Sequence, residues 1–418
     1  MKDRAITDEQ EYRLTRADEY VWERSRRLGL SRRRFLQLLA AGGMAAAMGG
    51  EIFPAARGAQ AAPADSDVIV KPTPPDLFND YLGRIKEMRW EAMRPRGYLV
   101  PNELFFIVDS SRTVRVDAKA WRLRIEGSGV LQPREFTYDE ILGMPSTSVV
   151  RFVECGGNGR RFFVDSYGKP VPGAQFNLGL IGVAEWTGVP LREVLERAGL
   201  RRTARDVMPE GLDEAKVRRP FPIGKALADD TLIVYAMNGQ VLPSDHGFPV
   251  RVLVPGWIGV ANVKWVGRIE VSEQAIYTRW NTESYVMIGP DYKPEPPAKG
   301  HVLTVQNVKS AFELPWNAEL ATGRQLLRGR SWSGQGKIAR VDVSVDRGVS
   351  WQPARLREPN IPQAWVRWDV DWEARPGTYS LRARAMDERG NTQPVIVPWN
   401  EQGYLYNAVV SHPVGVRA

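Results

Sequence analysis

A single cysteine leads into a run of glycines and arginines in the segment Arg151-Phe152-Val153-Glu154-Cys155-Gly156-Gly157-Asn158-Gly159-Arg160-Arg161. A strand-like run precedes Cys155, and the three glycines that follow would let the backbone approach a bulky ligand closely. Two adjacent arginines would depress the pKa of the thiol and favour the thiolate, which is the form that binds a soft metal. A small buried cysteine in a turn explains the same residues about equally well. From the residues alone, both interpretations of this loop stay open.

The residue counts exclude several kinds of redox centre. With one cysteine and three histidines, the chain has no intramolecular disulfide, no c-type haem motif, too few thiols for an iron–sulfur cluster and no closely spaced zinc ligands. Any redox cofactor must therefore be held by non-covalent contacts and by at most one thiolate.

The overall composition is that of an ordinary globular protein. Of the 418 residues, 43% are hydrophobic and 25% are charged, and the formal net charge is +8. This length allows two domains with substantial cores. Since the basic residues form no long block, the sequence argues against nucleic-acid binding.

The first 61 residues resemble a twin-arginine signal peptide. The run Ser31-Arg32-Arg33-Arg34-Phe35-Leu36-Gln37 has the expected pattern, and a weakly apolar stretch from Leu38 to about Met48 follows it. Small residues around Ala59-Gln60-Ala61 offer a signal-peptidase site. The apolar stretch is too short and too glycine-rich for a membrane span, so the mature chain is expected to have none. We expect export of the folded protein to the periplasm, with a basic amphipathic helix that stays attached as the alternative.

The elements that must position the loop alternate between short strands and amphipathic segments. After an irregular lead-in over 62–100, the pattern over 101–288 predicts an α+β domain that contains the catalytic site. Its expected elements are strands at Leu104–Val108, Leu232–Tyr235 and Val250–Val254 and an amphipathic segment at Leu191–Ala198.

The last third of the chain has a different pattern. The proline-rich segment Gly289–Gly300 indicates a linker. Beyond it, apolar and polar residues alternate over Ile338–Val345, Trp365–Trp368 and Tyr379–Ala385, with turn signals between them. This spacing predicts an immunoglobulin-like β-sandwich over 300–418.

The loop around Cys155 also resembles that of a known family. Phe152–Arg160 is similar to the molybdenum-ligand loop of the sulfite oxidase family of molybdopterin enzymes. The resemblance runs from about Asn102 to Asn407 through the blocks Asn102–Phe106, Ala184–Leu191, Met237–Arg251, Val263–Trp265, Val341–Gly348, Asp387–Pro394 and Trp399–Gly403. It implies a sulfite-oxidase-type molybdopterin-binding domain, followed by a dimerisation domain through which the chain forms a homodimer.

The resemblance also assigns roles to individual residues. It makes Cys155 the thiolate ligand of molybdenum, Arg160 an anion-binding residue beside the metal, and Tyr285 the active-site tyrosine. The residues that it implies for binding the pterin and its phosphate are His246, Arg251, Asn262, Val263 and Lys264. Taken alone, these residues have structural explanations: a histidine in a turn, solvated basic residues on a strand, and a core tyrosine.

Three positions depart from the vertebrate-type sulfite oxidases. Val108, which we count among the cofactor-contacting residues, stands where those enzymes supply an arginine that helps to bind sulfite. Phe176 matches their substrate-pocket tryptophan, and Gln402 replaces an arginine of the second domain. Two lost cations would weaken binding of a small dianion, because each charge-assisted contact contributes roughly 1.5–3 kcal/mol. The departures favour the bacterial sulfane dehydrogenase (SoxC-type) subunits, which oxidise sulfur bound to a carrier protein.

The resemblance therefore implies molybdenum-dependent oxidation of sulfite or carrier-bound sulfane sulfur, with one molybdopterin per chain. Because this chain has no haem motif, its electrons must pass to a separate partner, for which we expect a periplasmic cytochrome c. Two alternatives stay open. One is another molybdopterin oxidoreductase, such as a sulfoxide or oxyanion reductase, and the other is a cofactor-free periplasmic binding protein.

Overall fold

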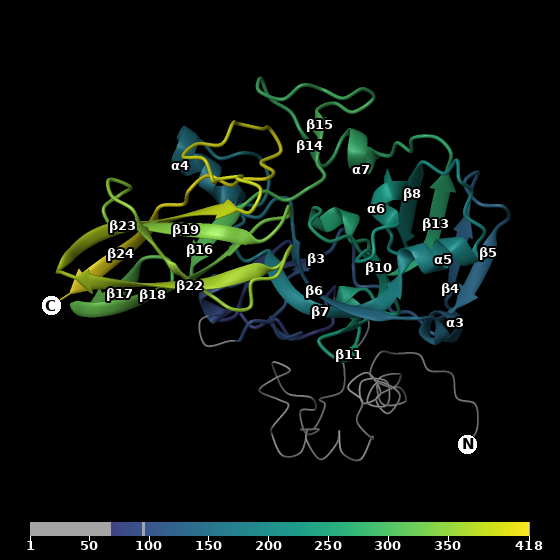
Figure 1. Cartoon of the computed structure of the whole chain (residues 1–418), viewed down its shortest axis with the longest axis horizontal. Helices are drawn as coiled ribbons and strands as arrows, with labels where there is room; N and C mark the ends of the chain where they lie inside the picture. Colours follow the sequence, from purple (N-terminus) through teal and green to yellow (C-terminus); the bar gives the residue numbers. More distant parts are fainter. Residues whose placement is uncertain (1–67, 94–96, 418) are drawn as a thin grey trace, which may run out of the picture.

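The computed structural model describes residues 68–93 and 97–417, so the expected signal peptide lies outside the described residues. Figure 1 shows two lobes, one holding the strands from β4 to β13 and the other holding the strands from β16 to β24. Within the described part of the chain, no helix has both the length and the apolar character needed to cross a membrane.

The first lobe contains two five-stranded sheets. The antiparallel sheet has the order β11-β10-β7-β6, with β12 also paired to β10. Its strands are β6 (Thr147–Glu154), β7 (Ile181–Pro190), β10 (Leu232–Met237), β11 (Gln240–Val241) and β12 (Arg251–Leu253). The second sheet has the order β5-β4-β13-β8-β9 and contains one parallel pair, β4 with β13. Its strands are β4 (Arg122–Glu126), β5 (Arg134–Thr137), β8 (Asp206–Gly211), β9 (Phe221–Pro222) and β13 (Val266–Ser272).

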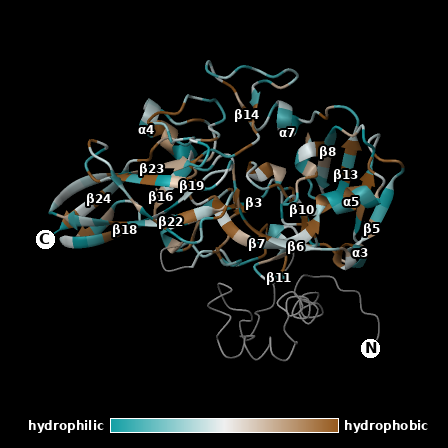
Figure 2. Ribbon diagram, viewed as in Figure 1, coloured by the Kyte–Doolittle hydropathy of each residue, from teal (hydrophilic) through white to brown (hydrophobic). Residues whose placement is uncertain are grey.

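Strand β10 is buried on both faces, which explains its continuous apolar sequence. Ile233 and Tyr235 point into the core between the two sheets, whereas Leu232, Val234 and Met237 pack into a second core on the other face. In Figure 2, hydrophobic residues mark β7 and β13 inside the lobe, and hydrophilic residues cover much of α5 and β5 at its edge.

Short helices and turns lie between the strands. The helices are α3 (Tyr138–Gly143), α4 (Phe163–Tyr167), α5 (Leu191–Arg197), α6 (Ile223–Ala226) and α7 (Arg279–Thr282), and the 3-10 turns are η1 (Trp90–Met93), η2 (Arg160–Phe162), η3 (Ser244–His246) and η4 (Gly259–Ala261). In Figure 1, α4 lies beside the strands of the second lobe, whereas the other labelled helices lie with the first lobe. The expected amphipathic segment is confirmed as α5, because Leu191, Val194 and Leu195 lie on its buried face. A capping box of Thr137 and Glu140 fixes the start of α3.

The second lobe is the predicted β-sandwich. One sheet contains β16 (Lys309–Phe312), β18 (Gly323–Trp332), β21 (Arg355–Arg357) and β22 (Trp365–Ala374). The other contains β17 (Ala318–Ala321), β19 (Ile338–Ser344), β20 (Gln352–Pro353), β23 (Gly377–Asp387) and β24 (His412–Arg417). The three alternating stretches of the sequence are confirmed as β19, β22 and β23, which pack around one apolar core.

The structure corrects two expectations about the first 110 residues. The lead-in over 62–100 is not wholly irregular, because it contains β1 (Phe78–Tyr81) and β2 (Ile85–Met88). The strand expected at Leu104–Val108 is reduced to β3 (Ile107–Val108), which joins β1 and β2 in a three-stranded sheet. Burial of Phe78 and Met88 in the core stabilises this sheet, and the local sequence has little β-propensity of its own.

The proline-rich segment between the lobes returns on itself. Strand β14 (Val286–Met287) pairs antiparallel with β15 (His301–Val302), so the intervening residues form a closed loop. Figure 1 shows this loop projecting at the top, between the two lobes.

Candidate active site

Most of the predicted site residues line one cavity. The predicted residues in its wall are Val108, Cys155, His246, Arg251, Asn262, Val263, Lys264 and Tyr285. They come from β3, from the end of β6, from β12, and from the loops around η3, η4 and β14, so the fold joins segments far apart in the sequence.

Cys155 is held where β6 ends. Its backbone N–H donates to Leu180 O at 2.9 Å, and its carbonyl accepts from Asn158 N at 3.0 Å, which closes a tight turn. Gly259 packs against this turn, where a Cβ would lie 2.8 Å from Glu154 O. A larger residue at position 259 would therefore push the cysteine loop away from η4.

Burial raises the pKa of the Cys155 thiol, so the expectation that two arginines lower it is wrong for the cofactor-free protein. Arg160 only partly offsets the cost of removing a thiolate from water. The guanidinium of Arg161 is turned toward Asn177 Oδ1 at 2.9 Å and lies 4.7 Å from the Trp316 ring centroid. Cys155 is therefore a neutral thiol in the cofactor-free protein.

Arg160 is the one predicted site residue outside the cavity lining. Its guanidinium lies between two rings, 5.2 Å from the centroid of Phe176 and 5.4 Å from that of Tyr404. Its hydrogen bonds to the carbonyls of Gly403 and Ala174 are long, at 3.4 Å each. Among the described residues, no carboxylate forms an ion pair with it, so its charge is available to a bound anion.

Tyr285 faces the cavity from a strained backbone with φ 57°. Its ring stacks on Tyr404, with centroids 5.2 Å apart. Burial raises the pKa of Tyr285 well above its ordinary value, so it acts as a neutral hydrogen-bond donor. The buried guanidinium of Arg219 donates to the carbonyls of Trp280 and Leu303. Leu303 N in turn donates to Tyr285 O at 3.1 Å, so these contacts fix the loop of Tyr285.

Three buried polar atoms in the cavity wall have no partner within the described structure. They are Asp213 Oδ2, His246 Nε2 and Arg251 Nε. Buried polar groups are almost always hydrogen-bonded, so this set indicates a polar ligand that supplies the missing partners. A pterin, with several donors and acceptors on one edge, fits such a set.

Basic residues gather around His246. Burial and the charges of Lys71, Lys264 and Arg251 hold the pKa of His246 well below its ordinary value. Arg251 donates to His246 O at 3.2 Å and to Asn262 O at 2.9 Å. These cations fit the phosphate of a phosphorylated cofactor.

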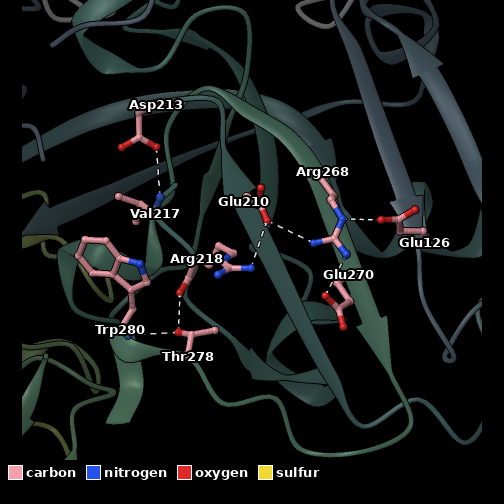
Figure 3. A network of polar contacts seen from close by, with 9 residues as sticks. All are labelled: Glu126, Glu210, Asp213, Val217, Arg218, Arg268, Glu270, Thr278 and Trp280. Carbon is pink, nitrogen blue, oxygen red and sulfur yellow. Dashed lines mark hydrogen bonds and ion pairs between the residues drawn. The ribbon is translucent and has the colours of Figure 1, made fainter. Parts of the chain in front are cut away.

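Sequence analysis missed three charged residues near the cavity, namely Lys71, Asp109 and Asp213. Asp213 lies in the loop after β8, where its other carboxylate oxygen accepts from Val217 N at 3.2 Å (Figure 3). Lys264 forms an ion pair with Asp109, which also lines the cavity. Lys71 donates to Asn102 O and Phe105 O. The sequence offers a weak signal for Asp213, a carboxylate just after a strand, and none for Lys71.

Lys71 leads to a pH prediction for the cofactor-free protein. Burial lowers its pKa to about 7, whereas an unfolded lysine titrates near 10.5. Between these values the unfolded chain binds more protons, so stability must rise with pH. We expect the thermal midpoint to rise from pH 7 to pH 9 in the wild type, relative to Lys71→Met. Parallel pH profiles of the two proteins by differential scanning calorimetry would contradict this expectation.

The comparisons with known proteins agree with this geometry. The family model for the oxidoreductase molybdopterin binding domain matches residues 110–280, and the model for the Mo-co oxidoreductase dimerisation domain matches residues 301–416. The chain is 35% identical to a sulfite oxidase of Gallus gallus, over 74% of this chain and 72% of that protein.

Two further relatives extend the comparison. The chain is 33% identical to the mitochondrial sulfite oxidase of Homo sapiens over 75% of its length, but it spans only 61% of that protein. The crystal structure of the sulfane dehydrogenase SoxCD from Paracoccus pantotrophus superposes with a TM-score of 0.72 and 28% identity, covering 88% of this chain and 95% of that one. These matches show that this protein belongs to the sulfite oxidase family of molybdopterin oxidoreductases.

Proposed function

We propose that this protein is a periplasmic molybdopterin enzyme that oxidises an inorganic sulfur compound and passes the electrons to a cytochrome c. The observation that carries the proposal is the cavity wall, which combines the chain's one thiol with three unpartnered buried polar atoms. Arg160, a cation without a carboxylate partner among the described residues, is near enough to Cys155 and Tyr285 of this wall for its charge to act on both.

Different residues of the cavity would hold different parts of the cofactor. Cys155 supplies the single thiolate to the metal. Asp213 and His246 offer hydrogen bonds to the pterin, and Arg251 and Lys264 hold its phosphate. When bound, the cofactor supplies oxygen-atom transfer and two-electron redox chemistry.

Arg160 and Tyr285 act on the substrate side. The oxidation of sulfite to sulfate takes up one water and releases two protons and two electrons. Arg160 holds the oxyanion through its charge, and Tyr285 donates a hydrogen bond at the reacting centre. Both side chains are pre-positioned, because Tyr404 packs against each of them.

Carrier-bound sulfane sulfur is the substrate class that we favour over free sulfite. The two positions at which the vertebrate-type enzymes place arginine are neutral here, and they differ in location. Val108 lines the cavity, whereas Gln402 donates outside it to Glu283 O at 2.7 Å. Arg160 is thus left to balance the charge of a free dianion. Sulfur bound to a carrier protein would need less positive charge in the site.

The partners follow from the same assignment. Two electrons per turnover must leave one at a time for a haem acceptor, which suits a cytochrome c. The second lobe would pair two chains into a homodimer, as the family description of this domain indicates. The twin-arginine pattern at Ser31–Leu36 supports export to the periplasm after cofactor insertion.

Metal analysis tests the proposal first. Protein purified from a host with twin-arginine export should contain about one molybdenum per chain, since one thiolate ligand is present. It should then reduce cytochrome c when a sulfur substrate is added. Absence of molybdenum would favour the binding-protein alternative, and turnover only in the direction of sulfoxide reduction would favour a reductase.

A second assay separates the two substrates. We expect higher kcat/KM with sulfane sulfur bound to a carrier protein than with free sulfite. A micromolar KM for free sulfite would contradict the sulfane assignment and leave the molybdopterin assignment in place.

A further inference from the structure

We propose that the C-terminal β-sandwich positions the metal-binding loop through a buried ion pair between Glu154 and Lys309. This role goes beyond the dimerisation for which the domain is named. Both residues lie outside the cavity lining, so they act on the site through Cys155 rather than by touching a ligand.

The carboxylate of Glu154 is completely enclosed. It is 0% exposed, and Lys309, its partner from β16, is 2% exposed. Lys309 Nζ lies 2.7 Å from Oε1, Asn158 Nδ2 donates to the same oxygen at 2.9 Å, and Trp332 Nε1 donates to Oε2 at 3.0 Å. Breaking such a pair from one side leaves a buried charge without a partner, which is strongly unfavourable.

The sandwich also binds the backbone on both sides of Cys155. Gln306 Nε2 donates to Glu154 O at 2.7 Å, and Leu405 N donates to Gly156 O at 2.8 Å. The residue before the thiol and the residue after it are therefore both fixed by the second lobe. This arrangement leaves the cysteine little freedom to move relative to the sandwich.

The geometry explains why the loop needs this anchor. Glu154 is the last residue of β6, so its side-chain contacts fix the point at which the turn of Cys155 begins. Three glycines within the next four residues provide no side chains of their own to fix the turn. A metal ligand must be held within a fraction of an ångström, and the second lobe supplies the restraint that the glycines cannot.

Hydrogen exchange of the cofactor-free full-length protein tests this role directly. In Lys309→Met, we expect the backbone amides of 155–159 to exchange roughly tenfold faster or more, because the loop opens locally without global unfolding. The milder Trp332→Phe removes one hydrogen bond, keeps an aromatic ring and should show the same change to a smaller extent. If Lys309→Met does not fold, the exchange rates of 155–159 in Trp332→Phe still test the proposal.

The matched control is Arg330→Met in the same sandwich. Arg330 is also fully buried, and it forms an ion pair with Glu313. It also donates to the carbonyls of Met93, Gly97 and Tyr98 and lies 4.4 Å from the centroid of the Trp365 ring, and none of these residues belongs to the cysteine loop. Arg330→Met should lower the unfolding midpoint without accelerating exchange of 155–159. Equal loop exchange in the Arg330 and Lys309 variants, or unchanged loop exchange in both Lys309→Met and Trp332→Phe, would overturn the proposal.

The metal-loaded enzyme gives a second readout, which rests on the proposed function. We expect Lys309→Met to shift the electron paramagnetic resonance signal of Mo(V). Lys309→Arg, which keeps the cation, should give the wild-type signal. With Lys309→Met, kcat should fall roughly 10–100-fold with little change in KM, as for other residues that orient a metal ligand. Faster loop exchange with an unaltered Mo(V) signal would contradict the role toward the metal, whereas failure to bind molybdenum in the wild type would contradict the proposed function alone.

Discussion

Replacing Cys155 by serine is expected to lower turnover by roughly a thousandfold or more, the scale of losing a group at the reacting centre. Sulfur and oxygen differ in softness, and a serine hydroxyl does not provide the thiolate that molybdenum needs from this loop. The fold should persist, because the side chains are similar in size and the turn is held by backbone hydrogen bonds to Leu180 and Asn158. Steady-state assays, metal analysis and circular dichroism of the same preparation measure all three quantities.

The control for this variant lies on the strand that leads into Cys155. Ser148, near the start of β6, shares a hydrogen bond of 2.8 Å with Thr187 Oγ1 and lies outside the cavity. Ser148→Ala should keep wild-type turnover within a small factor. Because Cys155 is the only thiol of the chain, thiol titration of the unfolded protein verifies the substitution. Full activity of Cys155→Ser would show that the metal assignment is wrong.

The sequence predicted those parts of the site that depend on local patterns. The strand leading into Cys155 is β6, and the apolar run Val250–Val254 contains β12, which carries Arg251. In the second lobe, alternation alone located β19, β22 and β23. Such patterns are legible because the period of two residues fixes which face of a strand is buried.

The rest depends on contacts between distant segments. Lys71 approaches His246 only because the chain before β1 packs beside η3, where Val70 N and Lys71 N donate to the Asp245 carboxylate at 2.9 and 2.7 Å. The raised pKa of Cys155 is likewise a result of burial. The two neighbouring arginines in the sequence suggest a lowered pKa, because burial is not visible in the sequence. No local pattern carries such information, since it arises from tertiary packing.

The inter-lobe contacts were also hidden in the sequence. The dimerisation domain was expected from the resemblance, but nothing in Lys309 or Trp332 alone indicates that they reach Glu154. Buried polar networks of this kind join residues about 150 positions apart, and only the folded chain brings them together.

Replacing Arg160 by glutamine is expected to raise the KM for an oxyanion substrate by about 10–150-fold. The range follows from the roughly 1.5–3 kcal/mol of a charge-assisted hydrogen bond, at about 1.4 kcal/mol for each tenfold change. Stability should change little, because the hydrogen bonds from the Arg160 guanidinium to the backbone carbonyls of Gly403 and Ala174 are long, at 3.4 Å each. The fall in affinity should extend to inhibition by sulfate, which the same charge would bind.

Arg161→Gln is the matched control, since it removes the adjacent charge of the same loop. Arg161 donates to Asn177 and packs over Phe162 and Trp316, so it does not face the cavity. We expect its loss to leave the KM within a factor of about two, because the guanidinium is turned away from the cavity, toward Asn177 and Trp316. Equal increases in KM for both variants would mean that general positive charge, and not the guanidinium held between Phe176 and Tyr404, attracts the anion. A carrier-bound substrate without a free oxyanion should respond to neither substitution, so the same pair of variants also distinguishes the two sulfur substrates.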